Sequence, residues 1–137
     1  MTNTLVSRER PYARECGASI PEKSVDCDGN VRFRSFFSGH SAISFTGASL
    51  VCWHHVKLGL LGAPGDVLSC ATAYAVAGTT ATLRVMGDMH YATDVLTGAI
   101  VGTAVGLGVP ALRSTSASGV SVQIVPVGAG LGVGGTF

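Results

Sequence analysis

The second two thirds of this chain carry almost no charge, which limits the folds that it can adopt. After His40, only six side chains are formally charged. Charged residues make up 12 % of the 137 residues and hydrophobic residues 47 %, and the mean hydropathy is +0.44. A chain of this length forms one domain with a single core. We therefore expect apolar segments that pack against each other or against lipid.

Three apolar segments have the length and the end signals of helices. The first spans residues 38–60 and has Ser38 as a candidate N-cap. The second spans residues 67–83, and the third spans residues 89–109 with Asp88 as a candidate N-cap. Residues typical of helix ends lie around these segments: Gly59, Gly62, Pro64, Asp66, Gly87 and Pro110. Helices of about 17–22 residues joined by short loops predict an all-α helical bundle, with the third helix ending near Pro110.

The third segment carries glycines at four-residue spacing, at Gly98, Gly102 and Gly106. Small residues at this spacing lie on one helix face and let a second helix approach closely, as in many membrane helices. Residues 95–112 contain no charge, and 18 residues is near the shortest length that spans a bilayer. Membrane insertion is the favoured interpretation. A tightly packed bundle in water is the alternative, because Ser and Thr are frequent in the second segment and Lys57 lies in the first.

The two ends of the chain differ from this helical part. Residues 1–34 contain the turn-forming residues Pro11 and Pro21 and predict an irregular loop region. Residues 114–137 form a Gly-rich tail, in which the alternation around Ile124 is compatible either with a strand or with no fixed structure. We predict one domain over residues 1–113 and a separate tail over residues 114–137.

The four cysteines form no C-x-x-C pair, which argues against a zinc ribbon. The simplest of the three possible pairings joins Cys16 to Cys27 and Cys52 to Cys70. A bridge that closes the first loop would stabilise the fold by roughly 2–3 kcal/mol in an oxidising compartment. Buried free thiols at Cys52 and Cys70 are the alternative.

The sequence predicts neither a metal nor a nucleic-acid partner. A net charge of +1 without a cluster of Lys and Arg is atypical of a nucleic-acid surface. His54 and His55 are adjacent, so on a helix their side chains face different directions and cannot share one metal ion. We expect no metal and no other cofactor.

The spacing of three ionisable residues, Arg84, His90 and Asp94, suggests a catalytic site. If His90 and Asp94 share a helix, positions four apart lie on one face, so the carboxylate can reach the imidazole ring. A carboxylate bound to one ring nitrogen leaves the other free as a nucleophile. Arg84 precedes the break at Gly87 and can bind phosphate oxygens from the neighbouring loop. An ordinary ion network on a helix surface is the alternative.

Ser38-Gly39-His40 adds a second candidate phosphate site. The N–H groups at the start of a helix bind anions, and the helix dipole reinforces this. His40 can donate a proton to a leaving oxygen. A serine that only caps the helix also explains this tripeptide.

These motifs together resemble those of the type-2 phosphatidic acid phosphatase family, whose superfamily includes bacterial acid phosphatases and vanadium haloperoxidases. The family's second motif is Pro-Ser-Gly-His, where this chain has Phe37 in place of proline. The third is Ser-Arg-x5-His-x3-Asp, where Leu83 replaces the serine. The first is Lys-x6-Arg-Pro, of which Arg10 and Pro11 match the end and Asn3 replaces the lysine. The resemblance covers roughly residues 3–112.

The resemblance implies a hydrolase for a phosphate monoester, either a lipid phosphate or a small soluble one, in the cell envelope. The implied residues are the catalytic His90, His40 and Asp94 and the phosphate-binding Arg10, Ser38, Gly39 and Arg84. His90 would form a phosphohistidine, and no metal would be needed.

Two departures from the family pattern keep alternatives open. Asn3 removes one positive charge, and the polar start of the chain lacks the helices that usually precede the first motif. A degenerate member or fragment that binds phosphate or lipid without turnover is one alternative, and a vanadium-dependent haloperoxidase is another. The sequence leaves the oligomeric state open.

Overall fold

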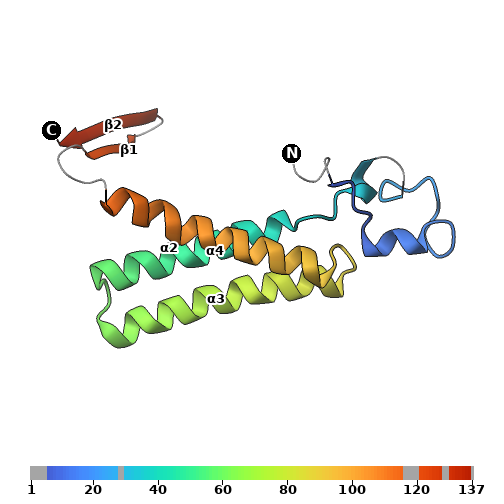
Figure 1. The fold of residues 1–137 in the computed structure, drawn as a ribbon, viewed down its shortest axis with the longest axis horizontal. Coiled ribbons are helices and arrows are strands. Elements are labelled where there is room, and N and C mark those ends of the chain that lie inside the picture. Colours follow the sequence, from blue (N-terminus) through green and yellow to red (C-terminus); the bar gives the residue numbers. More distant parts are fainter. Residues whose placement is uncertain (1–5, 28–29, 116–120, 128–129, 137) are drawn as a thin grey trace. The chain divides into compact units, whose positions relative to one another are not determined.

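The helical part of the chain is a bundle of three long helices (Figure 1). The computed structural model describes residues 6–27, 30–115, 121–127 and 130–136. The helices are α2 (Gly39–Leu58), α3 (Ala63–Met86) and α4 (Ala92–Thr115). The predicted all-α bundle is therefore confirmed. The chain forms two compact units, Met1–Leu107 and Gly108–Phe137, while the functional boundary near residue 113 stays a prediction.

The ends of α2 follow the predicted capping signals. The Ser38 hydroxyl oxygen accepts a hydrogen bond from the Ser41 N–H over 3.4 Å, so Ser38 is the N-cap. Gly59 ends the helix with a left-handed φ of 57°, a conformation that glycine adopts without steric cost. The next helix, α3, begins at Ala63 with Pro64 in its first turn, before the predicted start of the segment.

The third helix differs from its prediction at both ends. Asp88 is not an N-cap: it has a left-handed φ of 51°, and residues 87–91 form a loop before α4 begins at Ala92. At the other end, α4 continues through Pro110 to Thr115. Proline removes one N–H from the helix ladder, so the carbonyl of Gly106 loses its usual partner while the helix continues.

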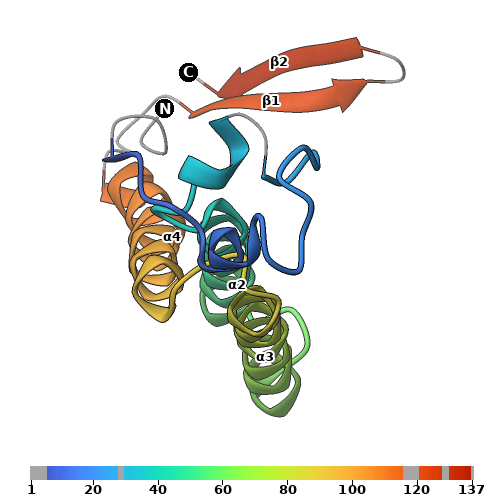
Figure 2. The same cartoon turned by 90° about the vertical axis from the view of Figure 1, so that its right-hand side faces the viewer.

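Glycines of α4 pack directly on the backbone of α2. A Cβ atom added at Gly98 would lie 2.5 Å from the Ser38 carbonyl oxygen, and one at Gly106 would lie 2.6 Å from that of Thr46. Gly102 faces the Ala42 carbonyl in the same way, and its own carbonyl accepts the Thr46 hydroxyl over 3.1 Å. The predicted close approach is thus made by the α4 glycines against α2, which lies between α4 and α3 (Figure 2).

Side-chain contacts and a disulfide join α2 to α3. Cys52 of α2 is bonded to Cys70 of α3. The Ser49 hydroxyl lies 2.8 Å from the Tyr74 hydroxyl, and the rings of Phe45 and Tyr74 meet edge to face with centroids 6.0 Å apart. These contacts fix the register of the two helices.

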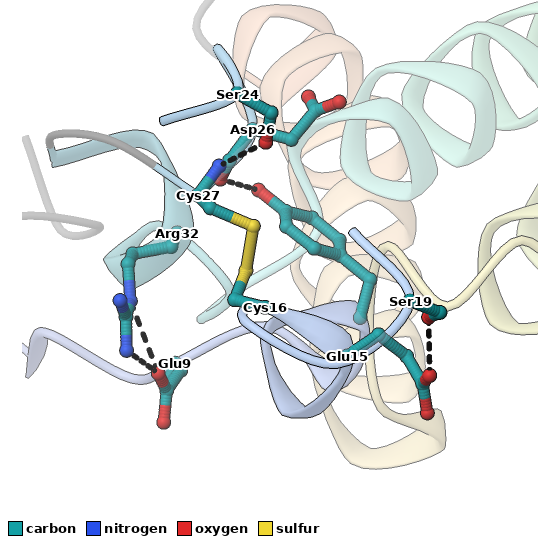
Figure 3. Close-up of a disulfide and its surroundings, with 9 residues drawn as sticks. Glu9, Glu15, Cys16, Ser19, Ser24, Asp26, Cys27 and Arg32 are labelled. Carbon is teal, nitrogen blue, oxygen red and sulfur yellow. Dashed lines mark hydrogen bonds and ion pairs between the residues drawn. A yellow bond between two sulfur atoms is a disulfide. The ribbon is translucent and has the colours of Figure 1, made fainter. Parts of the chain in front are cut away.

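A second disulfide, Cys16–Cys27, closes the irregular N-terminal region (Figure 3). This region contains two short 3-10 helices, η1 (Pro11–Glu15) and η2 (Asn30–Phe33). Both disulfides match the simplest predicted pairing, which is therefore confirmed. The buried Tyr12 ties the region to the loop before α4, because its N–H donates to the Asp88 carbonyl over 3.1 Å.

Much of the apolar surface of the helices is exposed. The buried hydrophobic residues of α2, α3 and α4 are small or medium in size: Ala48, Cys52, Ala77, Ala81 and Val95. Larger side chains such as Ile43, Leu83 and Ile100 are more than half exposed. Among the described residues, one helix, over Ala92–Ser114, is long and apolar enough to cross a membrane. Length and composition alone carry this observation, so it is weak evidence for a membrane protein.

The tail contains an antiparallel hairpin of β1 (Ser121–Val127) and β2 (Gly130–Thr136). Ser121 pairs with Thr136, and Val127 pairs with Gly130. Of the two alternatives left open by the sequence, the strand is the one observed around Ile124, and the Gly-rich segment supplies its partner.

We predict that Gly102→Ala lowers the free energy of unfolding by about 1–3 kcal/mol, because its methyl group overpacks against the Ala42 carbonyl. The matched control is Gly47→Ala on α2, where nothing lies within 4 Å of the added Cβ. It should stabilise the helix by up to about 1 kcal/mol. Denaturant unfolding of the two variants tests this, and equal effects would contradict glycine-mediated packing.

Candidate functional site

The loop at residues 87–91 holds His90 in a buried position. The carbonyl of Arg84, in the last turn of α3, accepts hydrogen bonds from the Met89 N–H and the His90 N–H over 3.1 and 3.2 Å. The His90 side chain is 4 % exposed, and its Nδ1 lies 2.7 Å from the Ser35 carbonyl oxygen. A carbonyl oxygen only accepts, so Nδ1 carries the proton and Nε2 keeps a lone pair.

Asp94 contacts three other groups instead of the His90 ring. The helical argument for a direct bond was wrong, because His90 lies in the loop and only Asp94 lies on α4. The Asp94 side chain is fully buried and forms an ion pair with Arg8. It also accepts the Ser35 hydroxyl over 2.5 Å and the Tyr91 N–H over 3.2 Å. The last contact resembles a capping box, in which an acidic side chain in the first turn satisfies the N–H that precedes the helix.

The start of α2 is bonded to the start of α4 at this place. The Ser38 N–H donates to the Asp94 carbonyl oxygen over 3.1 Å, and the Ser38 side chain is fully buried. This corrects the expectation that the Ser38 amide is free to bind phosphate. Gly39 and His40 supply the next N–H groups, and helix geometry gives groups at these positions no partner within the helix. Both residues are exposed.

Two guanidinium groups face this region without a carboxylate partner. Among the described residues, neither Arg10 nor Arg84 belongs to an ion pair, and both side chains are partly buried. The Nε of Arg10 is buried with no hydrogen-bond partner, while its Nη1 lies 3.6 Å from the Met89 sulfur. A buried donor without a partner is costly, so an anion that bound there would satisfy it.

The two histidines share the field of these arginines. Partial desolvation lowers the pKa of His40 although the residue is exposed, and the positive charges of Arg84 and Arg10 lower it further. Burial also lowers the pKa of His90, whereas the hydrogen bond to the Ser35 carbonyl raises it. The positive charges of Arg10 and Arg84 lower it further. The negative charge of Asp94 opposes them at His90. A neutral His90 near neutral pH is what a nucleophilic imidazole requires.

Sequence reasoning missed two residues that organise the site, Arg8 and Ser35. Arg8 pairs with Asp94, donates to the Thr93 hydroxyl over 2.8 Å and stacks over the Tyr91 ring with its guanidinium carbon 4.2 Å from the centroid. Ser35 contacts both Asp94 and His90. Neither residue belongs to a motif, so no sequence pattern pointed to them.

The remaining sequence predictions concern a lysine position and a metal. Asn3 lies outside the described residues. Within the described residues, no group of three or more His, Cys, Asp or Glu side chains is arranged to hold a metal ion. In the part of the chain that the structure describes, the site therefore consists of two histidines, two arginines without an ion-pair partner and a buried carboxylate network.

Comparison with known proteins identifies the family. Neither the curated proteins nor the solved structures contain a match to this chain. The model of the PAP2 superfamily matches residues 2–117, a range that includes every site residue described above. This superfamily is of the phosphatase type. The chain therefore belongs to the PAP2 superfamily, as its motifs predicted.

Proposed function

We propose that this protein hydrolyses phosphate monoesters through a phosphohistidine at His90. The observation that carries the proposal is the buried imidazole with a free Nε2, beside two arginines that have no carboxylate partner among the described residues. Guanidinium groups bind phosphate oxygens and stabilise the charge that develops on them during transfer. Membership of a phosphatase-type superfamily supports the same chemistry.

In the first step, the lone pair of His90 Nε2 attacks phosphorus and the ester P–O bond breaks. His40 gives its proton to the leaving oxygen, so that the alcohol departs neutral. Arg10, Arg84 and the amides of Gly39 and His40 hold the phosphate oxygens. Ser38 caps α2, the helix whose first amides these are. Asp94 helps to position His90 without contacting its ring.

In the second step, water attacks the phosphohistidine. The neutral His40 takes a proton from the water as its oxygen bonds to phosphorus, and the P–N bond breaks. Inorganic phosphate leaves, His90 recovers its lone pair, and His40 is again protonated. The two histidines thus account for both proton transfers.

An open apolar groove of about 510 Å³ favours a lipid phosphate over a small soluble one. It is lined by α2, α3 and α4 residues that include Val85, next to Arg84, and Val95, next to Asp94. Its lining is apolar apart from Thr82: Phe45, Ala81, Val85, Ala92, Val95, Leu96 and Ala99. The groove thus lies on α3 and α4, the helices that also carry Arg84 and Asp94.

A location in the cell envelope is part of the proposal. Disulfides persist in oxidising compartments, and this chain has two. The exposed apolar faces of the helices and the span-length helix over Ala92–Ser114 support contact with a membrane.

A second candidate is a member that binds phosphate or lipid without turning it over. The donation of the Ser38 amide to Asp94 favours this alternative, because it withdraws one donor from the phosphate site. Phosphate binding without hydrolysis in a folded sample would distinguish it. No contact among the described residues favours a haloperoxidase. That function would be recognised by halide oxidation that depends on added vanadate.

We predict that His90→Ala abolishes hydrolysis of a chromogenic aryl phosphate, because no other group forms the covalent intermediate. The matched control is His54→Ala, since His54 is exposed and its Nδ1 bonds only the Leu50 carbonyl of its own helix. Turnover that persists in His90→Ala would refute the proposed function. Acid-labile phosphate trapped on the wild-type chain but not on this variant would locate the intermediate.

We predict that His40→Asn slows an alkyl phosphate more than a nitrophenyl phosphate. General acid catalysis is worth roughly 10²–10⁴-fold and matters most when the leaving oxygen is basic. In the wild type, kcat/KM should fall as pH rises through the pKa of His40, which loses the proton that it donates. It should also fall at low pH, where His90 is protonated. Desolvation and the charges of Arg84 and Arg10 lower both pKa values from the ordinary histidine value, which moves the expected optimum toward acidic pH. Equal losses for the two esters would exclude this role.

We predict that Ala99→Phe raises KM for a long-chain phosphate ester by about tenfold more than for an aryl phosphate. Displacing two methylene groups from the groove costs about 1.6 kcal/mol, which is roughly tenfold in affinity. Val76→Phe is the control, because Val76 is exposed on α3 and does not line the groove. Equal changes in KM for both esters would argue against the groove as the chain site.

A further inference from the structure

Ser35 is the residue through which the buried carboxylate and the buried histidine of the site are connected. It lies between η2 and α2, and its side chain is fully buried. Its hydroxyl donates to Asp94 Oδ2 over 2.5 Å, and its carbonyl accepts from His90 Nδ1 over 2.7 Å. Its N–H donates to the Arg8 carbonyl over 3.0 Å. All three polar groups of this one residue are therefore used, each by a different segment of the chain.

Because His90 lies in a loop, a group other than Asp94 must fix which nitrogen of its ring carries the proton. Asp94 does not contact the ring, so it cannot by itself choose which ring nitrogen carries the proton. The acceptor that makes this choice is a backbone carbonyl in an irregular segment, where no helix or sheet ladder fixes its direction. Something else must hold that carbonyl, and the bonds from the Ser35 hydroxyl and amide do so.

The partners of the Asp94 carboxylate also weaken its electrostatic effect on His90. Arg8 pairs with Oδ1 of Asp94 and the Ser35 hydroxyl with Oδ2. An ion pair acts on a third group as a dipole, whose field falls off faster than that of a single charge. Pairing with Arg8 therefore weakens the direct effect of the Asp94 charge on His90, while the hydrogen bonds through Ser35 still connect the two residues.

We propose that Ser35 is a positioning residue that carries the effect of Asp94 to His90, fixing the Nδ1–H tautomer and holding Nε2 toward the phosphate. The proposal rests on the proposed function for the role of Nε2 as the atom that is phosphorylated. The tautomer itself is a property of the folded protein without substrate, and can be measured whether or not the protein turns over an ester.

The substitution that isolates this link is Ser35→Ala. It keeps the Ser35 carbonyl and N–H and removes only the hydroxyl bond to Asp94. The matched control is Ser49→Ala, which removes a hydroxyl from an equally buried serine whose partner is Tyr74 of α3. Both substitutions remove one oxygen atom from a buried site, so a difference between them reports the position of the hydroxyl.

The experiment is long-range ¹H–¹⁵N NMR of the histidine rings in the full-length chain, with His90→Ala to assign the signals. We expect the Nδ1–H tautomer at His90 in the wild type and in Ser49→Ala, and a mixture of tautomers in Ser35→Ala. An Nε2–H tautomer in the wild type, or an unchanged Nδ1–H tautomer in a folded Ser35→Ala protein, would overturn the proposal. If Ser35→Ala does not fold, Ser35→Thr keeps a hydroxyl and should keep the Nδ1–H tautomer, and an Nε2–H tautomer in the wild type still overturns the proposal.

Kinetics provide the second measurement and separate this proposal from the proposed function. We expect Ser35→Ala to lower kcat for an aryl phosphate by roughly 10- to 100-fold, with a smaller change in KM, because the nucleophile is misaligned while the arginines are untouched. A change confined to KM would overturn the proposal. A wild-type protein that has the Nδ1–H tautomer but no turnover would refute the proposed phosphatase and leave the positioning role of Ser35 standing.

Discussion

The burial of the Asp94 carboxylate is the constraint on which the rest of the site depends. A buried charge is tolerated only when it is paired and hydrogen-bonded, and this one takes a bond from Arg8, from the Ser35 hydroxyl and from the Tyr91 N–H. These partners come from the N-terminal segment, from the linker before α2 and from the start of α4. Satisfying one carboxylate therefore brings together the three segments that carry Arg10, His40 and His90.

Close packing of helices sets the distance at which this network forms. Gly98 lies against the Ser38 carbonyl at the start of α2, so the two helix starts approach closely where the Ser38 N–H reaches the Asp94 carbonyl. A larger residue at this position would separate the Gly39 amide from the loop that holds His90. The glycine spacing that resembles a membrane helix thus has a second consequence here, because it fixes the geometry of the polar end of the bundle.

The sequence predicted the elements whose signals are local. Ser38 and Gly59 bound α2 as their cap preferences indicate, and the observed cysteine pairing is the simplest of the three that the sequence left open. The start of α4 was missed because Asp88, a good N-cap residue, instead adopts a left-handed conformation, and its carbonyl accepts a long-range bond from the Tyr12 N–H. Ser35 could not be found for a related reason. Its role comes from contacts with residues more than fifty positions away, which no local pattern encodes.

The balance of charge at the site favours an anionic ligand in a way that the isolated motifs do not reveal. Arg8 neutralises Asp94, and among the described residues no carboxylate pairs with Arg10 or Arg84, which lie beside two histidines whose pKa they lower. The positive charges of Arg10 and Arg84 disfavour a third positive charge on either histidine ring. A phosphate dianion reverses this, because its charge raises the pKa of a nearby histidine. Substrate binding would therefore favour the proton on His40 that the departing alcohol requires, while Ser35 keeps the other proton on Nδ1 of His90.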